Sequence, residues 1–147
     1  MKEDHILYVV SYKNDKLVKI GKTRLSNRLN RYKKIRDDFK HCNFELSYEF
    51  YSNEKEISNL ERVLHKLYYK ERKSNYFKSG IGKTEWFKGD IKQKLLKEID
   101  HIRGTTFRHL KGPYKINDFS IKNKSNFFNY FYSFLFIGLI VYMFFPK

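Results

Sequence analysis

The residues best suited to chemistry in this chain lie between positions 17 and 31. In this segment, LVKIGKTRLSNRLNR, three arginines follow a glycine. Val18 and Ile20 alternate with Lys19 and Gly21, which is the period of a half-buried strand. After the glycine, arginines repeat at helical spacing, each one position before an apolar residue. The arginines are Arg24, Arg28 and Arg31, and the apolar residues are Leu25, Leu29 and Tyr32. We expect a catalytic or binding groove to begin at this helix, which has an arginine face beside a core face.

A strand that precedes this segment is expected to place a tyrosine beside the glycine. Residues 6–12, ILYVVSY, are rich in β-branched and aromatic residues, and Asn-Asp at 14–15 separates them from the next strand, which predicts a β-hairpin. A two-residue loop pairs Tyr8 with Gly21, which leaves room for the tyrosine, and puts Lys19 diagonally beside Tyr8. The opposite, buried face is expected to hold Leu7, Val9, Val18 and Ile20.

A third strand and two more helices complete the expected fold. Apolar residues alternate with polar ones over 44–50, and Asn53 with Glu56 forms a capping box for a second helix. Glu61 and His65 project side by side from that helix, at the edge of its buried face. A third helix is expected from Ile91 to about residue 102. The predicted fold class is therefore α+β, a three-stranded antiparallel sheet flanked by helices.

The C-terminal part of the chain has a different composition. We expect the folded domain to cover residues 1–104 and a basic linker to cover 105–126. Residues 127–145, FFNYFYSFLFIGLIVYMFF, carry no charge and are long enough to cross a bilayer as a helix. This pattern predicts a single-pass C-terminal anchor, with the basic domain on the cytosolic side. A buried or partner-bound aromatic helix is the alternative.

The chain is strongly basic. Its net charge is +15, and residues 1–110 hold 26 Lys or Arg against 15 Asp or Glu. Such an excess favours a polyanionic partner, either nucleic acid or an anionic membrane face, although a solvated lysine-rich surface is the alternative. Alanine is absent while Lys, Asn, Ile, Tyr and Phe are abundant, which indicates an AT-rich genome such as that of a large DNA virus, a phage or a low-GC microbe.

Several functional classes are excluded or disfavoured. The sequence IGKT occurs at 20–23 and 81–84, but the earlier glycine of a phosphate-binding loop is replaced by Lys16 and Phe77. Cys42 is the only cysteine, so neither an intramolecular disulfide nor a cysteine-based zinc site can form. The histidines show no spacing typical of metal ligands, and the charged N-terminus does not resemble a signal peptide.

The order of these motifs resembles the GIY-YIG nuclease superfamily, in its phage-T5-type and meiotically up-regulated-gene branch. Leu7-Tyr8-Val9 stands at the first tripeptide of that family and Lys19-Ile20-Gly21 at the second, so leucine replaces a glycine and lysine a tyrosine. The resemblance covers about residues 6–90. It rests on KIGKT, Arg28, Leu60-Glu61 with His65, and Glu85-Trp86-Phe87.

The resemblance implies metal-dependent cleavage of a nucleic-acid phosphodiester. Tyr8 would orient or deprotonate the attacking water, which requires Lys19 to lower the phenol pKa. Arg28 would hold the scissile phosphate, and Glu61 would hold one Mg²⁺ or Mn²⁺. Taken singly, each of these residues also has an ordinary structural interpretation.

Two hypotheses about function follow. The first is a membrane-anchored endonuclease acting on DNA. Its nucleic-acid-binding residues would be Lys22, Arg24, Arg31, Lys33, Lys34 and His65. The second is a catalytically inactive nuclease-fold scaffold, such as a minor capsid or virion membrane protein, with the lipid bilayer and other virion or membrane proteins as partners. A peripheral lipid-binding domain is a third possibility.

Overall fold

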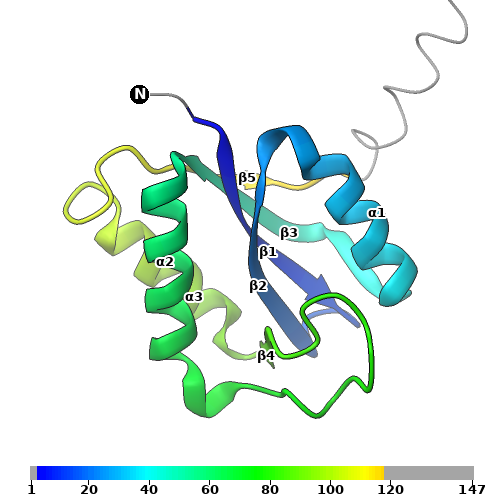
Figure 1. The fold of residues 1–147 in the computed structure, drawn as a ribbon. Helices are drawn as coiled ribbons and strands as arrows, with labels where there is room; N and C mark the ends of the chain where they lie inside the picture. The colour runs from blue at the N-terminus through cyan, green and yellow to red at the C-terminus, as the bar shows by residue number, and fades with distance from the viewer. Residues whose placement is uncertain (1–2, 118–147) are drawn as a thin grey trace, which may run out of the picture. The chain divides into compact units, whose positions relative to one another are not determined.

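The computed structural model describes residues 3–117, which form an antiparallel five-stranded sheet with helices on both sides (Figure 1). The strand order is β4-β2-β1-β3-β5. Along the chain the elements are β1 (His5–Tyr12), β2 (Leu17–Arg24), the short 3₁₀ turn η1 (Leu25–Asn27), α1 (Arg28–Asp38), β3 (Cys42–Ser52), α2 (Glu54–Leu67), η2 (Tyr69–Glu71), β4 (Trp86–Lys88), α3 (Ile91–Ile102) and β5 (Lys111–Lys115).

The β1–β2 hairpin has the predicted register. Tyr8 pairs with Gly21, and the last pair before the turn is Tyr12 with Leu17. The turn residues Lys13, Asn14 and Asp15 all have positive φ angles of 48–66°. Asn and Asp tolerate this left-handed region better than most residues, which explains why the chain reverses here.

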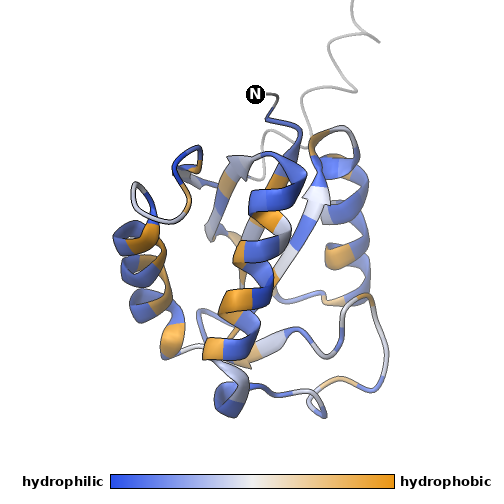
Figure 2. Cartoon of the chain, turned by 60° about the vertical axis from the view of Figure 1, so that its left-hand side comes forward, coloured by the Kyte–Doolittle hydropathy of each residue, from blue (hydrophilic) through white to orange (hydrophobic). Residues whose placement is uncertain are grey.

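Helices α2 and α3 cover one face of the sheet and form the main core (Figure 1). The capping prediction for α2 is confirmed, because the Asn53 side chain accepts a hydrogen bond from the Glu56 backbone N–H at 3.0 Å. Hydrophobic and hydrophilic positions alternate along both helices (Figure 2). The core of this face combines Leu7, Val9, Val18 and Ile20 with Ile57, Leu60, Leu64, Leu95 and Ile99.

The other face of the sheet is also buried, which the strand pattern did not indicate. Helix α1 lies on this side (Figure 1), and its Tyr32 packs edge-on against Tyr8 with ring centroids 5.8 Å apart. All eight residues of β1 are buried as a result. Polar residues on this face, including Lys19 and Glu49, therefore lie in the interior.

The three predicted strands are the centre of the sheet, and two short edge strands extend it. Strand β4 comes from a stretch for which no strand was predicted, and β5 comes from the expected linker at 105–126. The folded unit extends to Ile116, so the boundary placed at residue 104 is too early. The sequence KGPYK of β5 has neither β-branched residues nor alternation, and the buried side chains of Phe107, Leu110 and Ile116 hold it in place.

The predicted transmembrane segment at 127–145 lies outside the described residues. Within residues 3–117, no helix has both the length and the apolar character needed to cross a bilayer.

Candidate functional site

One edge of β2 collects most of the residues that the sequence identified, and we call it the Gly21 edge. Strand β4 pairs with β2 only at Leu17–Lys19, so the next residues of β2 have no paired strand on that side. Other groups take its place at Ile20. The backbone N–H of Ile20 donates to the Glu85 carbonyl at 3.2 Å, and the Ile20 carbonyl lies 3.0 Å from His65 Nε2. Loop and helix side chains thus converge where the sheet is open.

Tyr8 reaches this edge by lying across Gly21. A Cβ built on Gly21 would stand 2.5 Å from the Tyr8 hydroxyl and 2.6 Å from Cζ, so the predicted need for glycine is confirmed. The Tyr8 side chain is 1% exposed, and its hydroxyl makes no hydrogen bond within residues 3–117. Burial raises the pKa of Tyr8, the charge of Arg31 lowers it, and those of Glu85 and Glu61 raise it. The phenol therefore stays protonated at neutral pH.

Lys19 is fully buried and points at a different partner from the one expected. Its ammonium donates to the Gly82 carbonyl at 2.6 Å and to Glu85 Oε2 at 2.7 Å. The expectation that Lys19 lowers the pKa of Tyr8 is wrong, because the net effect on Tyr8 is upward and Lys19 is not among its causes. Lys19 fixes the loop that carries Glu85. The sequence analysis singled out Glu85-Trp86-Phe87 as a motif, but it did not predict that Glu85 pairs with Lys19.

Glu61 and Lys22 face each other across the junction of α2 and β2. Lys22 Nζ lies 3.2 Å from Glu61 Oε2 and donates to Ser58 Oγ at 2.9 Å. The side chains of Lys22 and Glu61 are 40% and 16% exposed, so this ion pair is reached by solvent. Both residues belong to the predicted site, and the structure brings them together.

His65 is held by two neighbours. Because the Ile20 carbonyl only accepts hydrogen bonds, Nε2 of His65 carries the proton, and Nδ1 accepts from Arg72 Nη2 at 3.4 Å. The ring also packs against Phe87, with centroids 5.3 Å apart. Both ring nitrogens are thus used inside the domain, and His65 orients α2 against the edge of β2.

Arg28 belongs to a separate group, the Glu49 cluster, formed by Arg28, Tyr32, Glu49 and Tyr51. Glu49 lies on β3 directly beside Tyr8 and is 2% exposed. Its Oε1 accepts from Arg28 Nε and from the Tyr32 hydroxyl, both at 2.5 Å, and its Oε2 accepts from Arg28 Nη2 at 3.2 Å. The Tyr51 hydroxyl also donates to Oε2. The sequence analysis did not identify Glu49, because its position beside Tyr8 depends on how β1 pairs with β3.

The remaining predicted nucleic-acid ligands are spread over β2 and α1. Arg24, Lys33 and Lys34 are exposed, and they form no ion pair among the described residues. Arg31 is half-buried and likewise unpaired in that part of the chain, and its charge acts on both the Tyr8 hydroxyl and Lys19. Of the three arginines, Arg31 is the one coupled to the Gly21 edge.

The donors available to a metal ion are few. In residues 3–117, no group of three or more His, Cys, Asp or Glu side chains could hold a metal ion. Glu61 offers a partly exposed carboxylate, and Mg²⁺ commonly binds through one or two carboxylates together with water and substrate phosphate. The edge therefore fits a hydrated ion shared with a substrate and does not fit a closed protein cage.

Comparison with known proteins adds one finding. A family model described as the T5orf172 domain matches residues 5–105. No curated protein and no solved structure matches the chain.

Proposed function

We propose that this chain, which belongs to the T5orf172 domain family, is a metal-dependent endonuclease that cuts DNA at the Gly21 edge. The T5orf172 domain is related to the GIY-YIG and phage-T5-type domains, and it indicates a nuclease-like, DNA-related function. The observation that carries the proposal is the arrangement at the open edge of β2. There the Tyr8 hydroxyl, which makes no hydrogen bond within residues 3–117, lies over Gly21. Lys22, the next residue of the strand, forms a partly exposed ion pair with Glu61 of α2.

Tyr8 acts in this proposal through its O–H group. A buried phenol with a raised pKa is a poor base, because the phenolate is rare at neutral pH. The protonated hydroxyl can donate a hydrogen bond, and it has no acceptor within the described protein. We assign it the task of orienting the attacking water or an oxygen of the scissile phosphate.

Glu61 would hold Mg²⁺, or Mn²⁺ in its place, after the Lys22 ammonium moves from the carboxylate to a substrate phosphate. The bound ion would supply charge stabilisation at the phosphate and activate water. Lys22 is suited to this exchange, because its long side chain is 40% exposed and reaches its partners through single contacts.

Contact with the scissile phosphate is assigned first to Arg31 and second to Arg28. Two nitrogens of Arg28 are bound to Glu49, and the charge of that carboxylate offsets the charge of the guanidinium. Arg31 has no such partner within residues 3–117 and is electrostatically coupled to Tyr8. Arg24, Lys33 and Lys34 would contact backbone phosphates, which confers affinity without sequence specificity.

The test is nicking of supercoiled DNA by the full chain with Mg²⁺ or Mn²⁺. Wild type should nick only with metal, and Glu61→Gln should lower the rate about 100-fold or more while the protein stays folded. Glu54→Gln, on the same helix but exposed and outside the edge, is the matched control and should keep the wild-type rate. A folded wild type that does not nick with either ion would contradict the proposal.

The second candidate function is a scaffold that binds DNA without cutting it. Two observations favour it: Lys19 and Arg28, half of the predicted catalytic set, are bound in ion pairs with Glu85 and Glu49. In this case the anchor proposed for 127–145 would hold the basic domain on the cytosolic side of a membrane or in a virion, with lipid and other virion or membrane proteins as partners. Salt-sensitive DNA binding without nicking would favour this function.

A further inference from the structure

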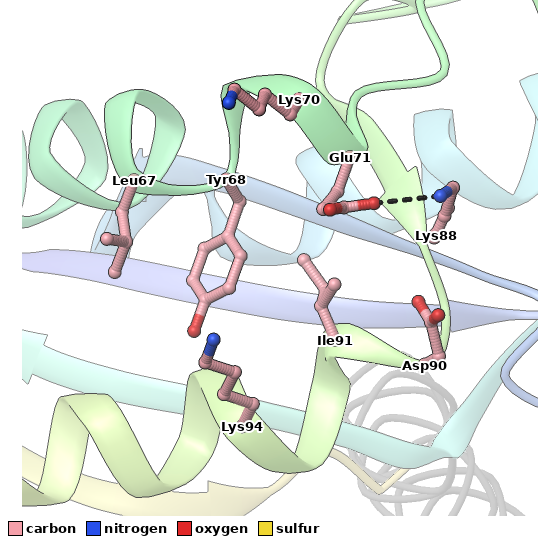
Figure 3. A pocket seen from close by; sticks show the side chains of 8 residues that line it. All are labelled: Leu67, Tyr68, Lys70, Glu71, Lys88, Asp90, Ile91 and Lys94. Carbon is pink, nitrogen blue, oxygen red and sulfur yellow. Dashed lines mark ion pairs between the residues drawn. The ribbon is translucent and has the colours of Figure 1, made fainter.

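A polar cavity lies on the face of the sheet that carries α2 and α3, away from the Tyr8 ring. It has a volume of about 390 Å³ and is bounded by the end of α2, by η2, by the end of β4 and by the start of α3 (Figure 3). We call it the Tyr68 pocket. Its lining residues are Leu67, Tyr68, Lys70, Glu71, Lys88, Asp90, Ile91 and Lys94.

The hydroxyl of Tyr68 has no hydrogen-bond partner within the described residues, although the side chain is only 4% exposed. Figure 3 shows this hydroxyl pointing toward the ammonium of Lys94, which projects from the first turn of α3. Burial raises the pKa of Tyr68, and the charge of Glu98 raises it further, so the O–H proton is retained. A buried O–H donor without an acceptor is costly, and a ligand oxygen would satisfy it.

The charges of the lining are divided between two sides of the cavity. On one side Glu71 pairs with Lys88 at 3.0 Å, so these two residues neutralise each other. On the Tyr68 side, Lys94 and Lys70 form no ion pair within residues 3–117. Asp90 is the remaining carboxylate, and it lies across the cavity from Tyr68 in Figure 3. On the Tyr68 side the lining therefore supplies two lysine ammonium groups and one O–H donor, while the charge of Glu98 acts on the Tyr68 hydroxyl from outside the lining.

The N-terminal end of α3 adds to this field. The helix spans Ile91–Ile102, has no acidic residue in its first turn, and receives no capping hydrogen bond from the Asp90 side chain. The positive end of a helix favours an anion nearby, and the Asp90 carboxylate at the N-cap supplies one such charge on the side of the cavity away from Tyr68 (Figure 3).

We propose that the Tyr68 pocket binds a phosphate group. Tyr68 donates its O–H to one phosphate oxygen, Lys94 supplies the principal charge, and Lys70 lies at the rim. The phosphate belongs either to a nucleic-acid strand or to a free phosphate compound, since both present the same oxygens. This site does not depend on whether the chain cuts DNA.

The experiment is a titration of the full chain with inorganic phosphate at constant ionic strength, followed by amide chemical shifts in NMR. Wild type should show saturable shifts centred on the α2–η2 junction and the start of α3. Lys94→Gln and Tyr68→Phe should each weaken binding, by about tenfold for Lys94→Gln. Lys97→Gln changes an exposed lysine of the same helix outside the cavity and should bind as wild type does.

A second arm identifies the source of the phosphate. If a 5′-phosphorylated oligonucleotide binds better than its unphosphorylated form, and Lys94→Gln removes that advantage, the ligand is a strand phosphate. If inorganic phosphate alone shows the Lys94 dependence, the ligand is a free phosphate. Absence of saturable shifts in wild type, or equal affinities for wild type, Lys94→Gln and Tyr68→Phe, would overturn the proposal. Nicking of DNA is a separate readout, so either proposal can fail without the other.

Discussion

The Gly21 edge and the Glu49 cluster lie on the two sides of Tyr8, yet they differ in how fully their polar groups are hydrogen-bonded and buried. In the Glu49 cluster, Arg28, Tyr32 and Tyr51 all bond one carboxylate that is 2% exposed. At the Gly21 edge the Tyr8 hydroxyl has no partner in the described residues, and Glu61 meets Lys22 in a pair that solvent reaches. Lys22 and Arg28 come from the same segment, residues 17–31, yet Arg28 stabilises the fold while Lys22 remains available to a ligand. Residues of one sequence motif can thus serve different purposes.

The largest expected effect is on stability, from Glu49→Ala. This change leaves the partly buried charge of Arg28 without its carboxylate and removes the acceptor of two tyrosine hydroxyls. Loss of one partner of a buried ion pair costs about 3–5 kcal/mol. Urea unfolding should show this loss, whereas Glu45→Ala, at an exposed position of the same strand, should stay within about 0.5 kcal/mol of wild type. Equal stabilities of the two variants would contradict the claim that the Glu49 cluster stabilises the fold.

The next effect concerns the close approach of Tyr8 to the strand. Gly21→Ala places a methyl group 2.5–2.6 Å from the Tyr8 hydroxyl and Cζ, and we expect a loss of about 1–3 kcal/mol. In a Tyr8→Leu background the same substitution should cost clearly less, because the shorter side chain does not lie over Gly21. The two costs are measured by chemical denaturation as a double-mutant cycle. An unchanged cost in the Tyr8→Leu background would show that the ring is not the obstacle.

The tyrosines predict a pH dependence. The pKa of Tyr32 is raised well above 10.0 in the folded protein by burial and by Glu49, so the folded state keeps a proton that the unfolded state loses. Its contribution to stability is present below pH 10 and declines as the pH rises above that value, at up to about 1.4 kcal/mol per pH unit. The stability difference between wild type and Tyr32→Phe should therefore shrink between about pH 9.5 and 11. A difference that stays constant or grows over this range would contradict the assignment.

The smallest effect is expected from Lys22→Gln at the Gly21 edge. Its ion pair with Glu61 is partly exposed, so the free energy of unfolding should change by less than about 1 kcal/mol. If Lys22 of the wild type binds a DNA phosphate, Lys22→Gln should reduce the slope of log affinity against log salt concentration by about one. Fluorescence anisotropy at several salt concentrations measures this slope. A slope identical to that of wild type would remove Lys22 from the interface.

Local patterns predicted much of the central fold. Alternation and the Asn-Asp turn were sufficient for the β1–β2 register, and the pairing of Tyr8 with Gly21 followed from it. The edge strands were missed for a physical reason. Strand β5 is held by Phe107, Leu110 and Ile116, which flank it, and its own residues carry no strand pattern.

The candidate site was predictable as a set of positions, but the partners of its charges were not. Lys19 and Arg28 were identified from motifs, yet their bonds to Glu85 and Glu49 span 66 and 21 residues of sequence. Glu49 alternates with apolar residues on β3, which is typical of a solvent-facing position. It becomes interior only because α1 covers that face. Such long-range pairing decides which charges remain available, and a single sequence does not reveal it.

The most direct test of the central claim compares Glu61→Gln with Glu49→Gln in metal-dependent nicking of supercoiled DNA, under conditions where circular dichroism shows both variants folded. If the Gly21 edge performs the chemistry and the Glu49 cluster supports the fold, Glu61→Gln lowers the rate about 100-fold or more. Glu49→Gln then lowers it less than about tenfold, which corresponds to about 1.4 kcal/mol. A Glu49→Gln variant that loses nicking while Glu61→Gln retains it would contradict the account.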